Sequence, residues 1–191
     1  MKTKITLFLI LVAVGLSAAT YKSNKVKQGD SNQSELANGF TDANSFGFSP
    51  AATGMENVAA MQKALDQGGT IIVAKPGTYK IAATLYLDSN TEVIFGKGVF
   101  LKKVNEEGRF AQVFINKGAL TRTYNEDITL KGLHIIVNGV DNCSDLVLGL
   151  RGIIGFSYVK DLKLKGFRCY DLTGCQFGVQ INRFEDVIIE D

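Results

Sequence analysis

Three aspartates recur at the start of a repeated phrase and are the first candidates for acid–base chemistry. Asp127, Asp161 and Asp186 each precede an alternating apolar segment. On neighbouring strands they would lie about 4.8 Å apart, close to the roughly 5 to 5.5 Å between the carboxyl groups of a retaining glycosidase. Glu190 and Asp191 are sequence neighbours that would point to opposite faces of a strand. Because the three repeated aspartates stand beside turn residues, we expect them to satisfy backbone groups at bends rather than to catalyse a reaction.

His134 is the only histidine of the chain. The alternation of Leu133, His134 and Ile135 places its side chain outside the core, where it could line a groove. No acid or nucleophile accompanies it in the sequence, so we expect an exposed surface histidine.

Basic, aromatic and amide side chains could instead bind a ligand. Arginine offers a bidentate fork for a uronate carboxylate, and the candidates for such a clamp are Arg151, Arg168 and Arg183. Tyrosines could stack on sugar rings, although aromatic residues in repeated strands more often fill the interior; these are Tyr79, Tyr86, Tyr124, Tyr158 and Tyr170. Outward lysines are expected to keep a sheet face soluble, namely Lys131, Lys163 and Lys165. Asparagines expected at turns are Asn138, Asn142 and Asn182.

The three cysteines are too few for a disulfide scaffold, and their odd number leaves at least one thiol free or paired elsewhere. They are Cys143, Cys169 and Cys175. Cys169 occupies the repeat position that Ile135 fills in the preceding unit, so we interpret it as a small core residue. No metal-ligand spacing accompanies the cysteines, and the sequence therefore predicts neither a metal site nor a cofactor site.

The elements that must position these residues follow from the repeat. The phrase Asp127-Ile-Thr-Leu-Lys-Gly-Leu-His-Ile returns as Asp161-Leu-Lys-Leu-Lys-Gly-Phe-Arg-Cys and begins again at Asp186-Val-Ile-Ile. Apolar and polar residues alternate with the period of a strand that has one buried face. The glycine shifts the phase at a bend. Repeats of this kind predict an all-β solenoid, a parallel β-helix, in which each coil adds one strand to each stacked sheet.

The N-terminus has the pattern of a secretory signal peptide. Lys2 and Lys4 precede an apolar run that ends in Ser17-Ala-Ala, and the run is shorter than the roughly 20 residues of a membrane span. We expect a signal peptide over residues 1–19, and after its removal no stable membrane insertion. Removing two of the 21 basic residues would leave a neutral chain, which gives no support for nucleic-acid binding.

A polar segment over residues 20–45 is expected to be a flexible leader, and the organised domain is expected to span residues 46–191. Thr53 and Glu56 have the spacing of a capping box, and the apolar residues that follow fall on one face of a helix ending at Gly68-Gly69. We expect this short helix to cover the open end of the solenoid.

Several short motifs in order resemble a known superfamily. Ala60-Met-Gln-Lys-Ala-Leu-Asp, Gly68-Gly-Thr-Ile-Ile-Val, Pro76-Gly-Thr-Tyr and Leu87-Asp-Ser-Asn-Thr-Glu-Val are similar to the N-terminal cap and first coils of the pectin-lyase-like, right-handed parallel β-helix superfamily. Within it the chain most resembles glycoside hydrolase family 28, the polygalacturonase group. The family's Asn-Thr-Asp, Asp-Asp, Gly-His-Gly and Arg-x-Lys motifs do not occur in the sequence. We therefore expect a C-terminally incomplete domain, an inactive fragment, and catalytic residues beyond Asp191.

The resemblance implies a secreted or periplasmic enzyme that hydrolyses glycosidic bonds in a uronate-containing polysaccharide such as pectin. The expected mechanism is inverting and aspartate-based, needs no cofactor, and belongs to a protein that is monomeric when full length. One alternative is a polysaccharide lyase on the same fold, which would use Ca²⁺ or arginine to stabilise an anion. The other is a non-catalytic β-helix module for glycan binding or adhesion.

Overall fold

The computed structural model describes residues 39–137, 139–140 and 142–191. The expected signal peptide and residues 20–38 of the expected leader lie outside them, as does Asn138. In the part described, no helix is both long and apolar enough to cross a membrane.

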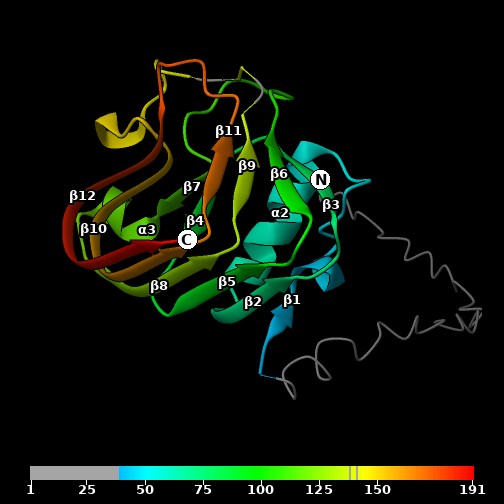
Figure 1. Ribbon diagram of the computed structural model, residues 1–191, viewed down its shortest axis with the longest axis horizontal. Coiled ribbons are helices and arrows are strands. Elements are labelled where there is room, and N and C mark those ends of the chain that lie inside the picture. Colours follow the sequence, from blue (N-terminus) through cyan, green and yellow to red (C-terminus); the bar gives the residue numbers. More distant parts are fainter. Residues whose placement is uncertain (1–38, 138, 141) are drawn as a thin grey trace, which may run out of the picture.

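The strands form two sheets in which every pair is parallel (Figure 1). The larger sheet has eight strands, with β12 paired to β10 beside the path β1-β2-β5-β8-β10-β7-β4. Its strands are β1 (Thr41–Asp42), β2 (Gly69–Val73), β4 (Leu85–Leu87), β5 (Thr91–Phe95), β7 (Phe114–Asn116), β8 (Asn125–Lys131), β10 (Gly152–Lys165) and β12 (Phe177–Glu190). The smaller sheet has the order β11-β9-β6-β3, with strands β3 (Gly77–Ile81), β6 (Val99–Lys103), β9 (His134–Ile136) and β11 (Arg168–Tyr170).

Helical segments stand between the strands: η1 (Ala43–Phe46), α2 (Gly54–Leu65), α3 (Lys117–Thr121) and η2 (Val147–Gly149). The predicted capping box at the start of α2 is confirmed, because the Thr53 side chain accepts from the Glu56 N–H and the Glu56 carboxylate accepts from the Thr53 N–H. Helix α2 contacts β3, β4 and η1, whereas α3 contacts β7, β10 and η2. The helices are therefore part of the layered structure.

The expected all-β, right-handed parallel β-helix is wrong. The strands lie in curled parallel sheets, the larger rolled like half of a barrel, and helices are interspersed among them, which is an α/β arrangement (Figure 1). The repeat encodes the period of its strands and their register, but it carries no information about how the sheets close. It also contains no signal for α3, a short helix directly after β7.

The leader boundary differs from the sequence expectation as well. Thr41 and Asp42 form β1, which pairs with β2 at Ile71 and Ile72, and η1 begins at Ala43. The Asp42 side chain caps η1 by accepting from the Asn44 N–H. The polar residues at the end of the expected leader therefore form the cap and the first turn of the fold.

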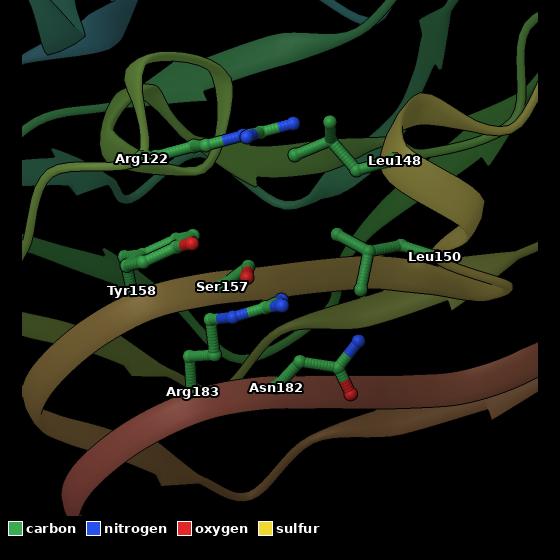
Figure 2. Close-up of a pocket in the computed structure, with 7 residues that line it drawn as sticks. All are labelled: Arg122, Leu148, Leu150, Ser157, Tyr158, Asn182 and Arg183. Atoms are coloured by element: carbon green, nitrogen blue, oxygen red, sulfur yellow. The ribbon is translucent and has the colours of Figure 1, made fainter.

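Positive backbone φ angles mark the bends of the long strands. Asp161 lies between the paired positions Lys160 and Leu162, opposite Asp127 on β8 and Asp186 on β12. The three aspartates have φ angles of 54°, 52° and 49° in chain order. Tyr158 and Arg183 stand opposite one another at a second bend of β10 and β12 (Figure 2). Aspartate tolerates this region better than most residues, which supports the interpretation of the aspartates as bend residues.

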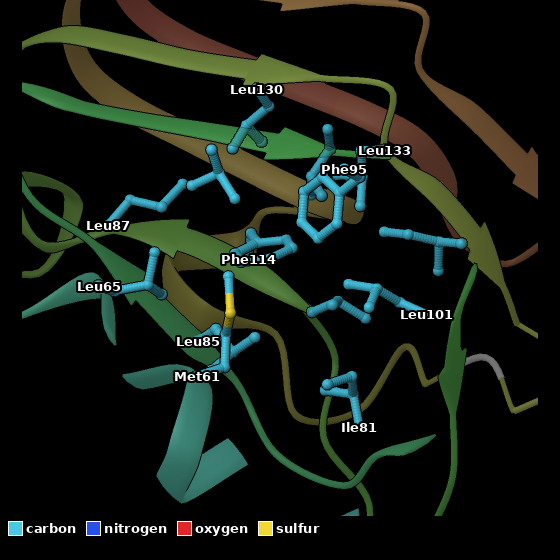
Figure 3. Close-up of a cluster of buried hydrophobic side chains, with 14 of the residues drawn as sticks. Met61, Leu65, Ile81, Leu85, Leu87, Phe95, Leu101, Phe114, Leu130 and Leu133 are labelled. Atoms are coloured by element: carbon cyan, nitrogen blue, oxygen red, sulfur yellow. The ribbon is translucent and has the colours of Figure 1, made fainter. Parts of the chain in front are cut away.

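One main hydrophobic cluster fills the space between the sheets and α2 (Figure 3). Strands alternate buried and partly exposed positions, as Val93 and Phe95 do in β5. The helix contributes Met61 and Leu65 to the same cluster. This alternation is the physical basis of the repeat, since each second side chain along a strand leaves water.

A disulfide joins Cys143 to Cys175 across the segments that follow β9 and β11. Beside it, Gln176 is buried and accepts from the Asn142 N–H. Lys103 is also fully buried and donates from Nζ to the Val140 carbonyl at 2.8 Å. Burial of an ammonium group is costly unless oxygen atoms replace its water, so the stapled segments complete the environment of Lys103.

Candidate functional site

The outer face of the small sheet is the candidate site. The buried residues on its inner face determine which side chains point outward. Along β3, β6, β9 and β11 the paired residues Tyr79, Leu101, Ile135 and Cys169 form one row across the sheet. The first three are fully buried and Cys169 packs against the core. Their neighbours in each strand must then point outward.

Two outward rows result. The first row contains the pairs Thr78 with Phe100 and His134 with Arg168. Each of these residues directly precedes a residue of the buried row in its strand. In the other, the register Lys80, Lys102, Ile136 and Tyr170 runs across all four strands. Four strands span about 14 Å at the usual spacing, so side chains distant in sequence share one continuous face.

Three rings gather on this face, and we call Phe100, His134 and Tyr170 the aromatic platform. The ring centroids of Phe100 and His134 are 5.4 Å apart, those of His134 and Tyr170 are 5.9 Å apart, and those of Phe100 and Tyr170 are 6.3 Å apart. The Tyr170 hydroxyl lies 3.2 Å from His134 Nδ1. Aromatic pairs at these separations support one another, and the hydrogen bond limits the rotation of both polar rings.

A shallow hollow of about 260 Å³ lies beside the platform and is lined by Phe100, Ile136, Tyr170 and Asp171. Lys80 and Lys102 stand in the same row as Ile136 and Tyr170, and neither forms an ion pair within the described part of the chain. Arg168 is paired with Asp191 at 3.3 Å. The face thus combines an apolar ring surface with two ammonium groups that are available to an anionic ligand.

The structure separates the residues that the sequence singled out. His134, Arg168 and Tyr170 meet on the small sheet. The three repeated aspartates lie at bends of the large sheet and contribute nothing to the platform. Cys169 is partly buried and packs against the core.

The remaining candidates have structural partners or a different location. Tyr79 is buried and stacks on Phe48 at 4.4 Å. Lys131 pairs with Glu92, Lys165 pairs with Glu190, and Lys163 is exposed on β10. Asn142 is buried and donates to Asp145, Tyr86 is half-buried, and Arg151 is exposed. Tyr124, Tyr158, Asn182 and Arg183 gather at the other bend of the large sheet.

Phe100, Ile136 and Asp171 were missed by sequence reasoning. The sequence does contain a signal for Phe100. It alternates with the apolar residues Val99 and Leu101, so the strand period places this large aromatic side chain on the outward face. Asp171 follows β11 with a φ of 58°, and no sequence pattern predicts this backbone angle. Its contact with the hollow depends on how the chain turns after Tyr170.

Within the described residues, no group of three or more His, Cys, Asp and Glu could hold a metal ion. Asp171 is the single carboxylate among the residues lining the hollow. Hydrolysis of a glycoside needs two carboxyl groups, so the arrangement by itself can bind a sugar but lacks a complete acid–base pair.

The comparisons with known proteins identify no family. The chain matches no known protein family and no curated protein. Among solved structures it is similar to one from Parabacteroides merdae ATCC 43184 described as a "putative glycosyl hydrolase", with 13% identity and a TM-score of 0.37 over 78% of this chain and 95% of that chain. A likeness at this level carries no argument about reaction or substrate.

Proposed function

We propose that this protein binds a uronate-containing polysaccharide across the outer face of its small sheet. The observation that carries the proposal is the aromatic platform beside two lysines that form no ion pair in the described structure. A pyranose ring has an apolar face that can lie against aromatic side chains, and its carboxylate needs a cation. Both requirements are met within adjacent strands.

The geometry assigns a part to each group. Phe100, His134 and Tyr170 offer the ring surface. Lys102 lies on β6, between Lys80 on β3 and Ile136 on β9, where it can meet the carboxylate of a sugar bound on the platform. Tyr170 holds His134 through the contact at Nδ1 and so fixes the ring that a sugar would cover. Removing about 50 Å² of apolar surface from water contributes roughly 1.2 kcal/mol per stacked ring.

The proposed reaction is hydrolysis of a glycosidic bond in that polysaccharide, such as pectin, by a secreted or periplasmic protein. Support for this part comes from the N-terminal sequence motifs alone, because the β-helix to which they were likened is absent from the described structure, and the disulfide agrees with an oxidising compartment. A second carboxyl group roughly 6.5 to 9.5 Å from Asp171 would be required for inversion.

A non-catalytic glycan-binding protein is the second candidate. It is favoured by the single carboxylate of the hollow, since a binding face needs no acid–base pair. Incubation with polygalacturonate separates the two functions: new reducing ends indicate hydrolysis, whereas binding without new ends indicates a binding protein.

Binding itself is tested by nuclear magnetic resonance on the imidazole of His134, the only histidine of the chain. Adding a galacturonate trimer is expected to shift its ring signals in a saturable manner. Tyr170→Ala is expected to weaken binding about tenfold, equivalent to roughly 1.4 kcal/mol. Lys102→Ala is expected to weaken binding of the galacturonate trimer but not of a neutral glucose trimer, and its effect should diminish at high salt.

Matched controls are Phe184→Ala, an exposed aromatic residue on β12, and Lys163→Ala, an exposed lysine on β10. Both are expected to bind as the wild type does. If the trimer leaves the His134 signals unchanged at millimolar concentration, the platform is not a glycan site and the proposal fails.

A further inference from the structure

We infer that a second, separate anion site lies at the bend of β10 and β12 and takes the carboxylate of an acidic sugar. It is a hollow of about 260 Å³ lined by Arg122, Leu148, Leu150, Ser157, Tyr158, Asn182 and Arg183. Its identification as a site for an oxyanion is independent of the aromatic platform. Its assignment to a uronate rests on the proposed function.

Four segments build this hollow, and Ser157 and Tyr158 of β10 form one of them. Arg122 ends α3, Leu148 belongs to η2, and Arg183 lies on β12. Figure 2 shows Arg122 and Arg183 on opposite sides of Tyr158, with both side chains extending toward the side of the hollow that Leu148 and Leu150 line. Two guanidinium groups that line one hollow from different elements fit a carboxylate, which can accept a parallel pair of hydrogen bonds from one fork and a further hydrogen bond from the other.

The charges of the hollow are uncompensated. None of the seven lining residues is acidic, and in the described structure neither Arg122 nor Arg183 forms an ion pair with a carboxylate. Arg122 and Arg183 are both exposed, and their positive charges line the same hollow. The ligand that these charges attract carries negative charge.

The walls of the hollow suit a ring that bears the anion. The guanidinium carbon of Arg183 lies 5.1 Å from the centroid of the Tyr158 ring, and Tyr124 meets that ring edge-on with centroids 5.7 Å apart. Tyr158 is thereby held in place and orients Arg183 through a cation–π contact. Asn182, in the same hollow, adds an amide that can donate to a hydroxyl, and Leu148 adds an exposed apolar wall.

Backbone strain concentrates here. Arg122, Leu148, Tyr158 and Arg183 have φ angles of 59°, 52°, 54° and 49°, so four of the nine non-glycine residues with positive φ in the described chain line one hollow. Glycine, asparagine or aspartate would adopt this conformation at lower cost. Strained residues that cluster around a pocket indicate a function for the side chains rather than for the bend.

The ligand on these grounds is a single sugar unit with one carboxylate. Two arginines hold the carboxylate, the Asn182 amide meets a hydroxyl, and the leucines contact the ring. A neutral sugar lacks the group that the arginines require, and a bare inorganic anion lacks the ring that the apolar wall contacts.

The test is calorimetric titration with galacturonate, glucose and sodium sulfate in the Tyr170→Ala background, in which binding at the platform is weakened about tenfold. Galacturonate is expected to bind with a stoichiometry of one, and Arg183→Ala or Arg122→Ala is expected to weaken it at least tenfold. Arg151→Ala, which removes an exposed arginine outside the hollow, is expected to have no effect. Arg183→Lys keeps the charge but loses the fork, so it should lie between wild type and Arg183→Ala.

Each result has one meaning, provided that circular dichroism shows the variants to be folded. Galacturonate binding that glucose and sulfate do not reproduce, and that the arginine variants lose, supports the site. Equal binding of sulfate reduces the site to a general anion site and overturns its assignment to a sugar. Arg183→Ala and Arg122→Ala without effect overturn the site itself. The His134 resonances report the platform separately, so failure of one site does not conceal failure of the other.

Discussion

The repeated aspartates illustrate how a single backbone angle can decide between two interpretations of one residue. Asp127, Asp161 and Asp186 lie opposite one another on adjacent strands, and all three have positive φ. At such a position aspartate, asparagine and glycine cost less than other residues. Their recurrence is therefore explained by the bend.

This explanation predicts the outcome of substituting Asp161. Asp161→Gly is expected to leave the free energy of unfolding unchanged or to raise it by about 0.5 to 1 kcal/mol, because glycine adopts positive φ freely. Asp161→Val is expected to lower it by about 1 to 2 kcal/mol, because a β-branched residue is strained there. Urea denaturation measures both changes. A stability loss in Asp161→Gly as large as that in Asp161→Val would show that the carboxylate itself is needed.

At the scale of elements, sequence predicted the strands and α2 well. Alternation in the repeat located β8 and β9, and a capping box at Thr53 located the start of α2. The same alternation placed His134 outside the core and Cys169 inside. These features depend on contacts within a few residues or on the burial of every second side chain, both of which a sequence displays.

The candidate sites were less predictable. The platform joins Phe100, His134 and Tyr170 from three strands, and the second hollow joins α3, η2, β10 and β12. The repeat gave the register of His134 with Arg168, but it contains neither Phe100 nor Arg122. Such juxtapositions arise from how the sheets curl and where the helices pack, and no local pattern encodes them.

An ion pair between neighbouring strands predicts how stability depends on pH. The hydrogen bond from the Lys131 ammonium holds the pKa of the Glu92 carboxyl below its ordinary value of 4.5, and the Thr70 hydroxyl adds to the effect. The unfolded chain takes up this proton first, so the contribution is complete above pH 4.5 and is lost as the pH falls through the lower folded-state pKa.

We therefore expect Glu92→Gln to unfold more readily than the wild type at pH 7, with a difference below about 1 kcal/mol because both side chains are partly exposed. The difference should shrink as the pH falls below 4.5 and through the lower folded-state pKa of Glu92. Thermal unfolding at several pH values measures it, and Glu126→Gln on β8, an exposed acid without an ion pair in the described residues, is the control. A difference that persists unchanged in acid would contradict the assignment.

At the scale of the whole molecule, the disulfide between Cys143 and Cys175 is a long-range constraint. It closes a loop with a sequence separation of 32 and holds Gln176 near the buried Lys103. On the loop-entropy account a bridge of this length contributes about 3 to 4 kcal/mol.

Cys143→Ser with Cys175→Ser, or reduction by dithiothreitol, is expected to lower the free energy of unfolding by that amount. Cys169→Ser, which leaves the bridge intact, is the control and should change stability less. Guanidinium denaturation with and without reductant gives the comparison. Equal stability of the oxidised and reduced protein would mean that the loop is constrained by its packing alone.

In the described structure β12 also forms a long strand edge, and this edge should govern the protein's behaviour at high concentration. Among the described residues β12 pairs only with β10, and Phe184, Ile188 and Ile189 are 55%, 50% and 59% exposed. Unpaired backbone groups flanked by apolar side chains favour pairing between chains, whereas a lysine on an edge opposes it. We expect the mass measured by light scattering to rise with concentration, and Ile189→Lys to return it toward that of one chain.

Leu120→Lys, which changes an exposed apolar residue of α3, should leave the association unchanged. A wild-type mass of one chain at every concentration would show that the bends at Arg183 and Asp186 already prevent a second strand from docking, since a bent edge cannot offer a continuous ladder.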